Sequence, residues 1–297
     1  INCRILVMAG VMPWERGALR EHRLTPAIHS LRELADFGSE TGEPLDIHLK
    51  IDTGLNRLGA QAGAKDIISA IQAARSVRVE GLMTHFASAA DFISQQTEEQ
   101  IRAFDGMVSA LAEAGIRPPL THCAGTNAIA YLRPGAPKTM VRPGHAIYGY
   151  VSPGRGQAPP ATFRVEPALV WKTHIVSVKE IPARAKVGYG GSFVAPAPMR
   201  IAVLAAGYAD GIPHLLSNKG KVIAGGRLAP ILGSVSMDLT TIDISASPNL
   251  RPGDEVTLLG REGDASLDAQ QIARTAKTIS YNVLCGISAR VKRCYVD

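Results

Sequence analysis

Hydrophobic and polar positions follow two different patterns in the first half of the chain. Short alternating or apolar stretches predict strands at residues 5–9, 46–52, 77–85, 121–124, 139–141 and 145–150. Helical spacing predicts helices at 26–37, 66–74 and 97–114. The last of these begins with a Thr97-x-x-Gln100 capping box and stops at Gly115. Strands that alternate with helices predict a parallel sheet or barrel.

The pattern changes after residues 152–160, a segment rich in Pro and Gly that is typical of a linker. Beyond it, strands are predicted at 168–181, 200–206, 221–224, 239–244, 255–259 and 287–296, separated by Gly, Pro and Asp turns. Only residues 266–278 have helical spacing there. We therefore predict two domains, a β/α domain at 1–160 and a small β-rich domain at 161–297.

The composition narrows the class of protein. Of the 297 residues, 46% are hydrophobic but only 5% are aromatic, which favours the aliphatic core of a parallel α/β fold. The net charge of +6 is spread along the chain without a basic run, so nucleic-acid binding is not expected. Neither a membrane span nor a secretory signal is expected. The four cysteines lack CxxC spacing, which argues against a zinc or redox motif and suits a reducing cytoplasm.

Residues with useful chemistry follow the predicted strands of the first half. Arg57 is either an anion clamp or a solvated loop arginine, and His85 is either a ring that stacks on a flat ligand or an ordinary half-buried histidine. Thr126 could line a phosphate site or simply cap a helix. Arg142, followed by Gly144, could bind a ligand closely or belong to a turn. Because parallel strands share one carboxyl edge, these residues together favour a flat, anionic, phosphorylated ligand.

Seven motifs in a fixed order resemble the alanine racemase family. They are Lys50–Gly59, Thr84–Ala87, Val141–Gly144 with Tyr148-Gly149, Val187–Gly190, Gly207–Gly211, Ser236–Asp238 and Ile279–Val283. The resemblance covers essentially the whole chain. It implies a pyridoxal-phosphate enzyme with a (β/α)₈ barrel followed by a β domain. The implied reaction interconverts L- and D-alanine for peptidoglycan, in the cytoplasm, and the implied assembly is a homodimer whose subunits share each active site.

The resemblance also implies a role for each matching residue. Arg57 would hold the cofactor's phenolic oxygen and the substrate carboxylate, while His85 would pack against the pyridine ring and Arg142 would partner its nitrogen. The cofactor phosphate would be bound by Thr126, Gly144, His145 and Tyr281. The backbone amide of Met237 would bind the substrate carboxylate across the dimer interface. Lys50 matches a lysine that is carbamylated in some members, and no metal is implied.

Two departures from the family pattern change the expectation. The family's cofactor lysine has no counterpart here, since neither Lys50 nor Lys65 occupies its place, so we expect a fragment that starts around the third barrel strand and is inactive as given. The usual tyrosine base is replaced by Phe193, which cannot carry a proton, so Tyr189 and Tyr208 become the candidate phenols. The alternatives are a degenerate homologue that binds the cofactor without catalysis, and a racemase for another amino acid such as serine.

Overall fold

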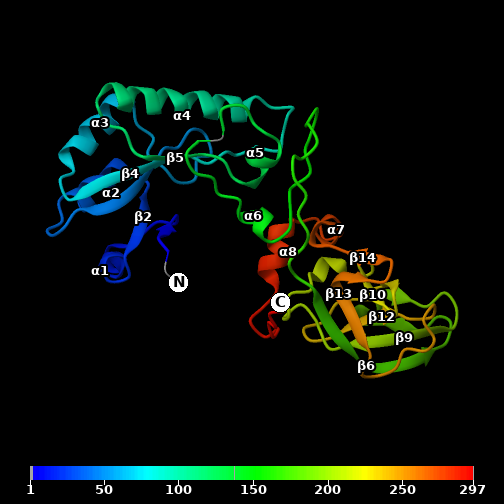
Figure 1. The fold of residues 1–297 in the computed structure, drawn as a ribbon. Helices are drawn as coiled ribbons and strands as arrows, with labels where there is room; N and C mark the ends of the chain where they lie inside the picture. Colours follow the sequence, from blue (N-terminus) through cyan, green and yellow to red (C-terminus); the bar gives the residue numbers. More distant parts are fainter. Residues whose placement is uncertain (1–2, 137, 297) are drawn as a thin grey trace. The chain divides into compact units, whose positions relative to one another are not determined.

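The computed structural model describes every residue except 1–2, 137 and 297. The chain divides into two units, Ile1–Glu166 and Pro167–Asp297. The first unit is built on a parallel sheet with helices, and the second is dominated by antiparallel strands (Figure 1). Among the described residues, no helix combines the length and the apolar composition needed to cross a membrane.

The first unit has five parallel strands whose spatial order follows the sequence. They are β1 (Ile5–Val7), β2 (Leu24–Ile28), β3 (Leu45–Lys50), β4 (Val77–Met83) and β5 (Leu120–His122). Between and after them lie η1 (Pro13–Glu15), α1 (Arg16–Glu21), α2 (Leu31–Gly38), α3 (Ala64–Ala73), α4 (Gln96–Glu113), α5 (Thr126–Ala130) and α6 (Gly144–Ile147). This is part of a (β/α)₈ barrel, which confirms the predicted fold class.

The alternation of side chains along β3 places the hydrophobic core on one face of the sheet and polar groups on the other. Ile47 and Leu49 are fully buried in a core that includes Leu34, Phe37, Ile67, Phe104 and Leu111 from α2, α3 and α4. His48 and Lys50 point to the opposite face, because successive side chains of a strand alternate. The helix-covered face stabilises the unit, and the other face is available for chemistry.

The second unit confirms the predicted β domain. Its main sheet has the order β11-β10-β13-β6-β9-β12, and β14 pairs with β13. The strands are β6 (Trp171–Ile181), β9 (Met199–Leu204), β10 (Lys221–Ala224), β11 (Arg227–Pro230), β12 (Thr240–Asp243), β13 (Glu255–Glu262) and β14 (Ala265–Leu267). A separate hairpin joins β7 (Lys186–Val187) to β8 (Phe193–Val194), and the helical elements are η2 (Tyr189–Gly191), η3 (His214–Leu216), α7 (Ala269–Thr275) and α8 (Ser280–Gly286).

The helix predicted at 26–37 is wrong over its first five residues, of which 26–28 belong to β2. Pro26 lies within this strand, opposite Val7 of β1. Because Pro is rare inside sheets, the sequence pattern does not indicate a strand here. The helix begins only at Leu31, where the Ser30 hydroxyl accepts a hydrogen bond from the amide of Glu33 (3.0 Å). The preceding strand and this cap together set the start of α2.

Three predicted strands are also wrong. Residues 139–141 form no strand, and next to them only a single bridge joins Arg142 to Gly125. Residues 145–150 instead continue α6 and a turn. Residues 287–296 form no strand, because the Arg293 guanidinium donates hydrogen bonds to carbonyls of its own segment (2.7–2.8 Å) that a neighbouring strand would need. The second unit has another helix, α8, which the sequence pattern did not indicate.

The predicted capping box at the start of α4 is absent. The helix begins at Gln96, one residue early, and the Gln100 side chain turns toward the sheet. Its amide nitrogen donates to the carbonyl of His85 (3.1 Å), and its oxygen accepts from the amide of Ala87 (2.9 Å). Gln100 therefore fixes the loop after β4.

Residues 152–160, which were predicted to be a linker, lie inside the first unit. There Arg155 forms an isolated β-bridge with Asp91, a residue of the loop after β4.

Candidate functional site

The loop after β3 is organised by one carboxylate. Oδ1 of Asp52 accepts hydrogen bonds from the amides of Gly54, Leu55 and Asn56 (3.0–3.1 Å). Burial raises the pKa of Asp52, but these bonds and one from Gln61 outweigh it and leave the pKa lowered. Gly54 has φ +128°, a backbone conformation that L side chains rarely adopt. The motif is thus a tight turn.

Two basic residues of this motif differ in environment. Arg57 lies exposed just beyond the turn. Lys50, at the carboxyl end of β3, is only 5% exposed. Burial, followed by the positive charges of Arg57 and Arg142, lowers the pKa of Lys50. This makes the amine of Lys50 easier to deprotonate than that of a surface lysine.

The Arg142 guanidinium ties together the ends of β4 and β5. Nη2 donates to the carbonyl of Thr84 (2.7 Å) and to that of Cys123 (3.3 Å), and it lies 3.3 Å from Nδ1 of His85. Nη1 donates to Nδ1 of His122. Burial lowers the pKa of Arg142 to about 10, so the group is still charged at neutral pH. Its Nε is buried without a partner among the described residues.

The Cys123 thiol lies behind this cluster. Its Sγ donates to the carbonyl of Ala136 (2.9 Å) and the side chain is 1% exposed. Burial raises the pKa of the Cys123 thiol to about 11, so it stays protonated. It belongs to the packing of the site and offers no nucleophile.

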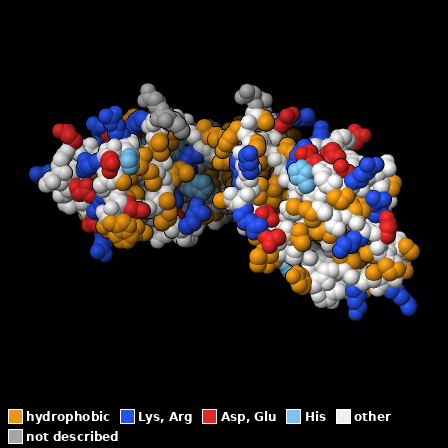
Figure 2. Space-filling model, turned by 90° about the horizontal axis from the view of Figure 1, so that it is seen from below, with side chains coloured by type: hydrophobic (Ala, Val, Ile, Leu, Met, Phe, Trp, Pro, Cys, Tyr) orange, Lys and Arg blue, Asp and Glu red, His pale blue; other side chains and the backbone are white. Residues whose placement is uncertain are grey.

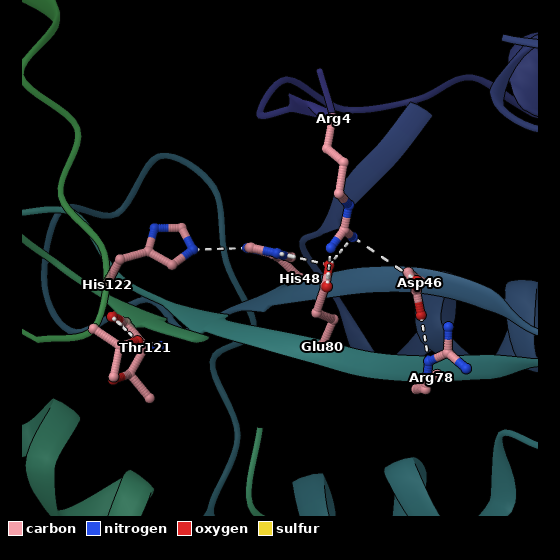
Figure 3. A network of polar contacts seen from close by, with 8 residues as sticks. Arg4, Asp46, His48, Arg78, Glu80, Thr121 and His122 are labelled. Atoms are coloured by element: carbon pink, nitrogen blue, oxygen red, sulfur yellow. Dashed lines mark hydrogen bonds and ion pairs between the residues drawn. The ribbon is translucent and has the colours of Figure 1, made fainter. Parts of the chain in front are cut away.

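The structure adds two histidines that the sequence analysis did not select. His122, the last residue of β5, is fully buried, and its Nε2 lies 2.7 Å from Nδ1 of His48 on β3 (Figure 3). The residue spacing along the chain, 74 positions, hides this contact. The available signal was that both residues sit on the non-core side of alternating strands. The surface of the first unit on the side away from α3 and α4 shows other histidine side chains next to basic ones (Figure 2), whereas His48 and His122 are buried.

Three of the four residues expected to bind phosphate meet where α5 and α6 begin, whereas Tyr281 belongs to the second unit. The Thr126 hydroxyl accepts a hydrogen bond from the amide of Ala146 (3.1 Å), so it joins the two helix starts. The amide of Gly144 donates to the carbonyl of Arg142 (2.9 Å), which makes a tight turn directly after Arg142. Nothing lies within 4 Å of a side chain added at Gly144, and His145 is buried. Thr126, Gly144 and His145 are thus neighbours of Arg142.

In the second unit, two loops bring together the predicted Tyr208 and Met237. The amides of Tyr208 and Ala209 donate to the carbonyls of Ser236 and Met237, both at 2.9 Å. A side chain at Gly207 would come within 2.3 Å of the Met237 carbonyl, so the close approach requires glycine. The side chains of Tyr208 and Met237 are about half exposed.

The hairpin β7-β8 carries Phe193 and the second candidate phenol, Tyr189. Tyr189 is 77% exposed. Its carbonyl accepts from the hydroxyl of Ser234 (3.4 Å), at the start of the loop that leads to Met237. Phe193 packs against a small core of Val187, Ile201 and Leu232. Tyr281, at the start of α8, is 43% exposed. Tyr189, Tyr208 and Met237 therefore share one loop region of this unit.

Comparison with known proteins gives matches over both units of the chain. Residues 1–153 match the alanine racemase N-terminal domain and residues 168–295 match the alanine racemase C-terminal domain. An alanine racemase from Halothermothrix orenii is 36% identical over 299 residues, which cover 99% of this chain and 78% of that protein. The chain belongs to the alanine racemase family.

Solved alanine racemases share the fold. The enzyme from Streptomyces coelicolor A3(2) superposes with a TM-score of 0.90 at 31% identity, covering 100% of this chain and 79% of that one. The enzyme from Bartonella henselae, solved with covalently bound pyridoxal phosphate, has a TM-score of 0.86 at 24% identity, covering 99% and 79%. Members of the alanine racemase family are isomerases that use pyridoxal phosphate.

The residues of the first unit fit that cofactor. The buried, unpartnered Nε–H of Arg142 needs an acceptor, and the unprotonated nitrogen of a pyridine ring is one. His85 is uncharged at neutral pH, because burial and then the charges of Arg142, Lys50 and Arg57 lower its pKa to about 4. A flat neutral ring beside a cation suits a cofactor ring rather than a second anion.

The histidines of the site predict a specific pH dependence of stability. The pKa of His85 is lowered to about 4, and burial followed by the charges of Arg142 and His48 lowers that of His122 to about 3. Below about pH 6.5 the unfolded chain therefore binds more protons than the folded chain. The free energy of unfolding is highest above this pH and falls as the pH is lowered toward 4. Urea unfolding of the first unit, followed between about pH 7 and pH 4, measures it.

A matched pair of substitutions separates this effect from general acid sensitivity. His122→Asn removes one buried imidazole and should make the fall shallower, whereas His22→Asn changes an exposed histidine and should leave it as in the unchanged chain. A fall of equal steepness in both variants would contradict the assignment of the pH dependence to the site.

Proposed function

We propose that this chain carries the cofactor and substrate groups of a pyridoxal-phosphate-dependent alanine racemase. The observation that carries the proposal is the partly buried Arg142 guanidinium, whose buried Nε has no partner among the described residues, at the carboxyl edge of a parallel sheet and beside neutral His85. This arrangement fits an unprotonated ring nitrogen. When bound, pyridoxal phosphate supplies an electron-withdrawing ring that stabilises negative charge at the α-carbon of an amino acid.

Arg142 sets the character of the reaction. Its pKa of about 10 keeps it protonated, so it can donate a hydrogen bond to the ring nitrogen but cannot give that nitrogen a full proton. Electron withdrawal is therefore limited, which favours rapid return of a proton to the α-carbon. Racemisation needs this return, whereas competing reactions need a longer-lived carbanion.

The other groups of the first unit bind and orient. His85 presents a flat, uncharged ring to the cofactor. Thr126, with the amides of Gly144 and His145, is proposed to hold the phosphate. Arg57, exposed beyond the Asp52 turn, is proposed to bind the phenolic oxygen and the substrate carboxylate. Lys50 is proposed to be carbamylated, because a buried amine with a lowered pKa is more often neutral and able to react with carbon dioxide.

The second unit is proposed to supply proton transfer and substrate binding. Tyr189 and Tyr208 are the proposed acid–base groups, while Met237 through its amide and Tyr281 through its phenol keep the roles that the family resemblance implies. We further propose a homodimer in which one subunit completes the site of the other. The cysteines, all four of them free, fit a reducing cytoplasm, which is where D-alanine for peptidoglycan would be made.

The full-length gene product, supplied with pyridoxal phosphate, tests the proposal. In deuterated water we expect L-alanine to exchange its α-hydrogen for deuterium. We also expect D-alanine to form from L-alanine faster than D-serine forms from L-serine. Faster formation of D-serine would assign the enzyme to another amino acid. Bound cofactor without α-hydrogen exchange in any amino acid would instead support a non-catalytic binding protein.

A separate prediction concerns the proton carrier. If Phe193 occupies the position of the family's tyrosine base, Phe193→Tyr restores a phenol and should raise D-alanine formation at least about tenfold in the full-length gene product, since a positioned acid–base group contributes that much or more. Phe193→Leu keeps an apolar side chain against Val187 and Ile201 and should leave the rate unchanged. Equal rates in both variants would show that position 193 is not the base position.

A further inference from the structure

A line of polar side chains leads from the site toward the amino end of the sheet (Figure 3). Nδ1 of His122 accepts from Arg142, and Nε2 of His122 lies 2.7 Å from Nδ1 of His48. On the other side of its ring, Nε2 of His48 lies 3.5 Å from Oε2 of Glu80. The Glu80 carboxylate is bound in turn by the Arg4 guanidinium. This series, His122–His48–Glu80, is called the histidine relay below.

The direction of each hydrogen bond in the histidine relay follows from the Arg142 end. A guanidinium can only donate, so Nδ1 of His122 must be unprotonated. Neutral His122 then carries its proton on Nε2 and donates it to Nδ1 of His48. The proton of His48 is therefore on Nε2, facing the Glu80 carboxylate. The opposite tautomer of His122 would set an N–H against the N–H of Arg142.

Both rings are sealed from water, so the protein alone selects their tautomers. His122 is 0% exposed and His48 is 2% exposed. The Glu80 side chain is 13% exposed, and its hydrogen bond to Arg4 lowers its pKa, which keeps the carboxylate charged. Burial likewise keeps His48 neutral by lowering its pKa. The Glu80 carboxylate is therefore a permanent hydrogen-bond acceptor next to His48, and no water competes with it inside the pair of histidine rings.

The backbone makes room for the histidine relay in two ways. Gly81 of β4 pairs with His48, and a side chain at this position would lie 2.4 Å from Nδ1 of the ring. The register between β3 and β4 also shifts, since Ile47 is opposite Val79 but His48 is opposite Gly81. Glu80 is the extra residue of this bulge, and bulges redirect side chains. The bulge at Glu80 and the absence of a side chain at Gly81 thus both allow His48 to lie between His122 and Glu80.

We propose that His48 and Glu80 are positioning residues for Arg142: together with the guanidinium they hold His122 in a single tautomer, and His122 in turn holds the guanidinium with Nε directed at the cofactor's ring nitrogen. The proposal rests on the proposed function for the identity of that ligand, but the tautomers themselves exist in the chain without any ligand. Neither residue touches the cofactor, and their effect passes through His122.

The first experiment reads the tautomers directly. In the chain labelled with ¹⁵N-histidine and free of cofactor, long-range ¹H–¹⁵N correlation should show His48 and His122 each with a protonated Nε2 and an unprotonated Nδ1. Glu80→Gln removes the anion while keeping the size of the side chain, and it should move both signals toward a mixture of tautomers. A protonated Nδ1 on His122 in the unchanged chain would overturn the proposal.

The matched control is Asp46→Asn. Asp46 is an acidic residue on β3 that contacts Arg4 and Arg78 but does not belong to the histidine relay. Asp46→Asn therefore removes one negative charge, as Glu80→Gln does, but leaves the contact between His48 and Glu80 intact. The second readout is the affinity of the same chain for pyridoxal phosphate, followed by absorbance. We expect Glu80→Gln to weaken this affinity about three- to tenfold, because a neutral amide oxygen is a weaker acceptor than a carboxylate, and Asp46→Asn to leave it unchanged.

The two readouts separate the two proposals. Identical spectra and affinities in Glu80→Gln and Asp46→Asn would overturn the role of the histidine relay. The expected tautomer change in a chain that has no affinity for pyridoxal phosphate would support the fixed tautomers while counting against the proposed function and against the positioning of Arg142 for that cofactor. Glu80→Asp, which keeps the anion, should retain the tautomers of the unchanged chain.

Discussion

Arg142→Ala should weaken the affinity for pyridoxal phosphate at least about thirtyfold and lower alanine racemisation of the full-length gene product about a hundredfold or more. The substitution removes a partly buried cation and leaves the buried His122 ring and the carbonyls of Thr84 and Cys123 without their donor. Loss of one partner of a buried charged hydrogen bond costs about 2–5 kcal/mol, which corresponds to these factors. Absorbance titration and D-alanine formation are the measurements.

The control for this prediction is Arg142→Lys. A lysine keeps the charge but lacks the planar fork that serves several acceptors at once, so an intermediate loss is expected. Urea unfolding of both variants shows whether the first unit remains folded. Full affinity and full activity in a folded Arg142→Ala variant would contradict the assigned role.

Arg133→Met should lower the free energy of unfolding of the first unit by about 3 kcal/mol, the range for breaking a buried charge network. Arg133 is 1% exposed, and its Nε donates to the carbonyl of Ala89 (3.0 Å) while another nitrogen donates to that of Asp91. Its guanidinium also pairs with Glu98 of α4 and lies 3.5 Å from the centre of the Phe92 ring. One cation thus joins α4 to the loop after β4.

The matched variant is Glu98→Gln. The Glu98 side chain is 39% exposed, so water replaces much of the lost ion pair and a change below about 1 kcal/mol is expected. Urea unfolding of both variants measures the difference. If Arg133→Met is no less stable than Glu98→Gln, the carbonyl and ring contacts of Arg133 contribute little.

Local patterns were enough to predict the parallel β/α character of the first half and the sheet edge of its candidate site, but not β2 or α6. The alternation in β3 separates Ile47 and Leu49 from His48 and Lys50, and the chemistry follows the strand ends as it does in barrels. Arg142 and His85 could be selected because both are polar residues at or beyond predicted strand ends. The structure brings them within 3.3 Å of each other.

What the sequence could not predict depends on contacts between distant residues. Nothing local indicates that His48 meets His122, since the contact requires the β3–β4 register shift and the space at Gly81. Gln100 matched a capping box, yet its hydrogen bonds to the loop after β4 determine its position instead. Pro26 lies in a strand despite its usual effect, because pairing on both sides of β2 outweighs local preference.

Because Cys123 is buried, its thiol should react more slowly than the three other thiols of the chain. Cys3, Cys285 and Cys294 are exposed, so an alkylating reagent reaches them in the native protein. Cys123 is buried and its pKa of about 11 leaves almost no thiolate, so it is alkylated only when the first unit opens. The rate of the fourth alkylation therefore reports how often this unit opens, without any probe attached to the site.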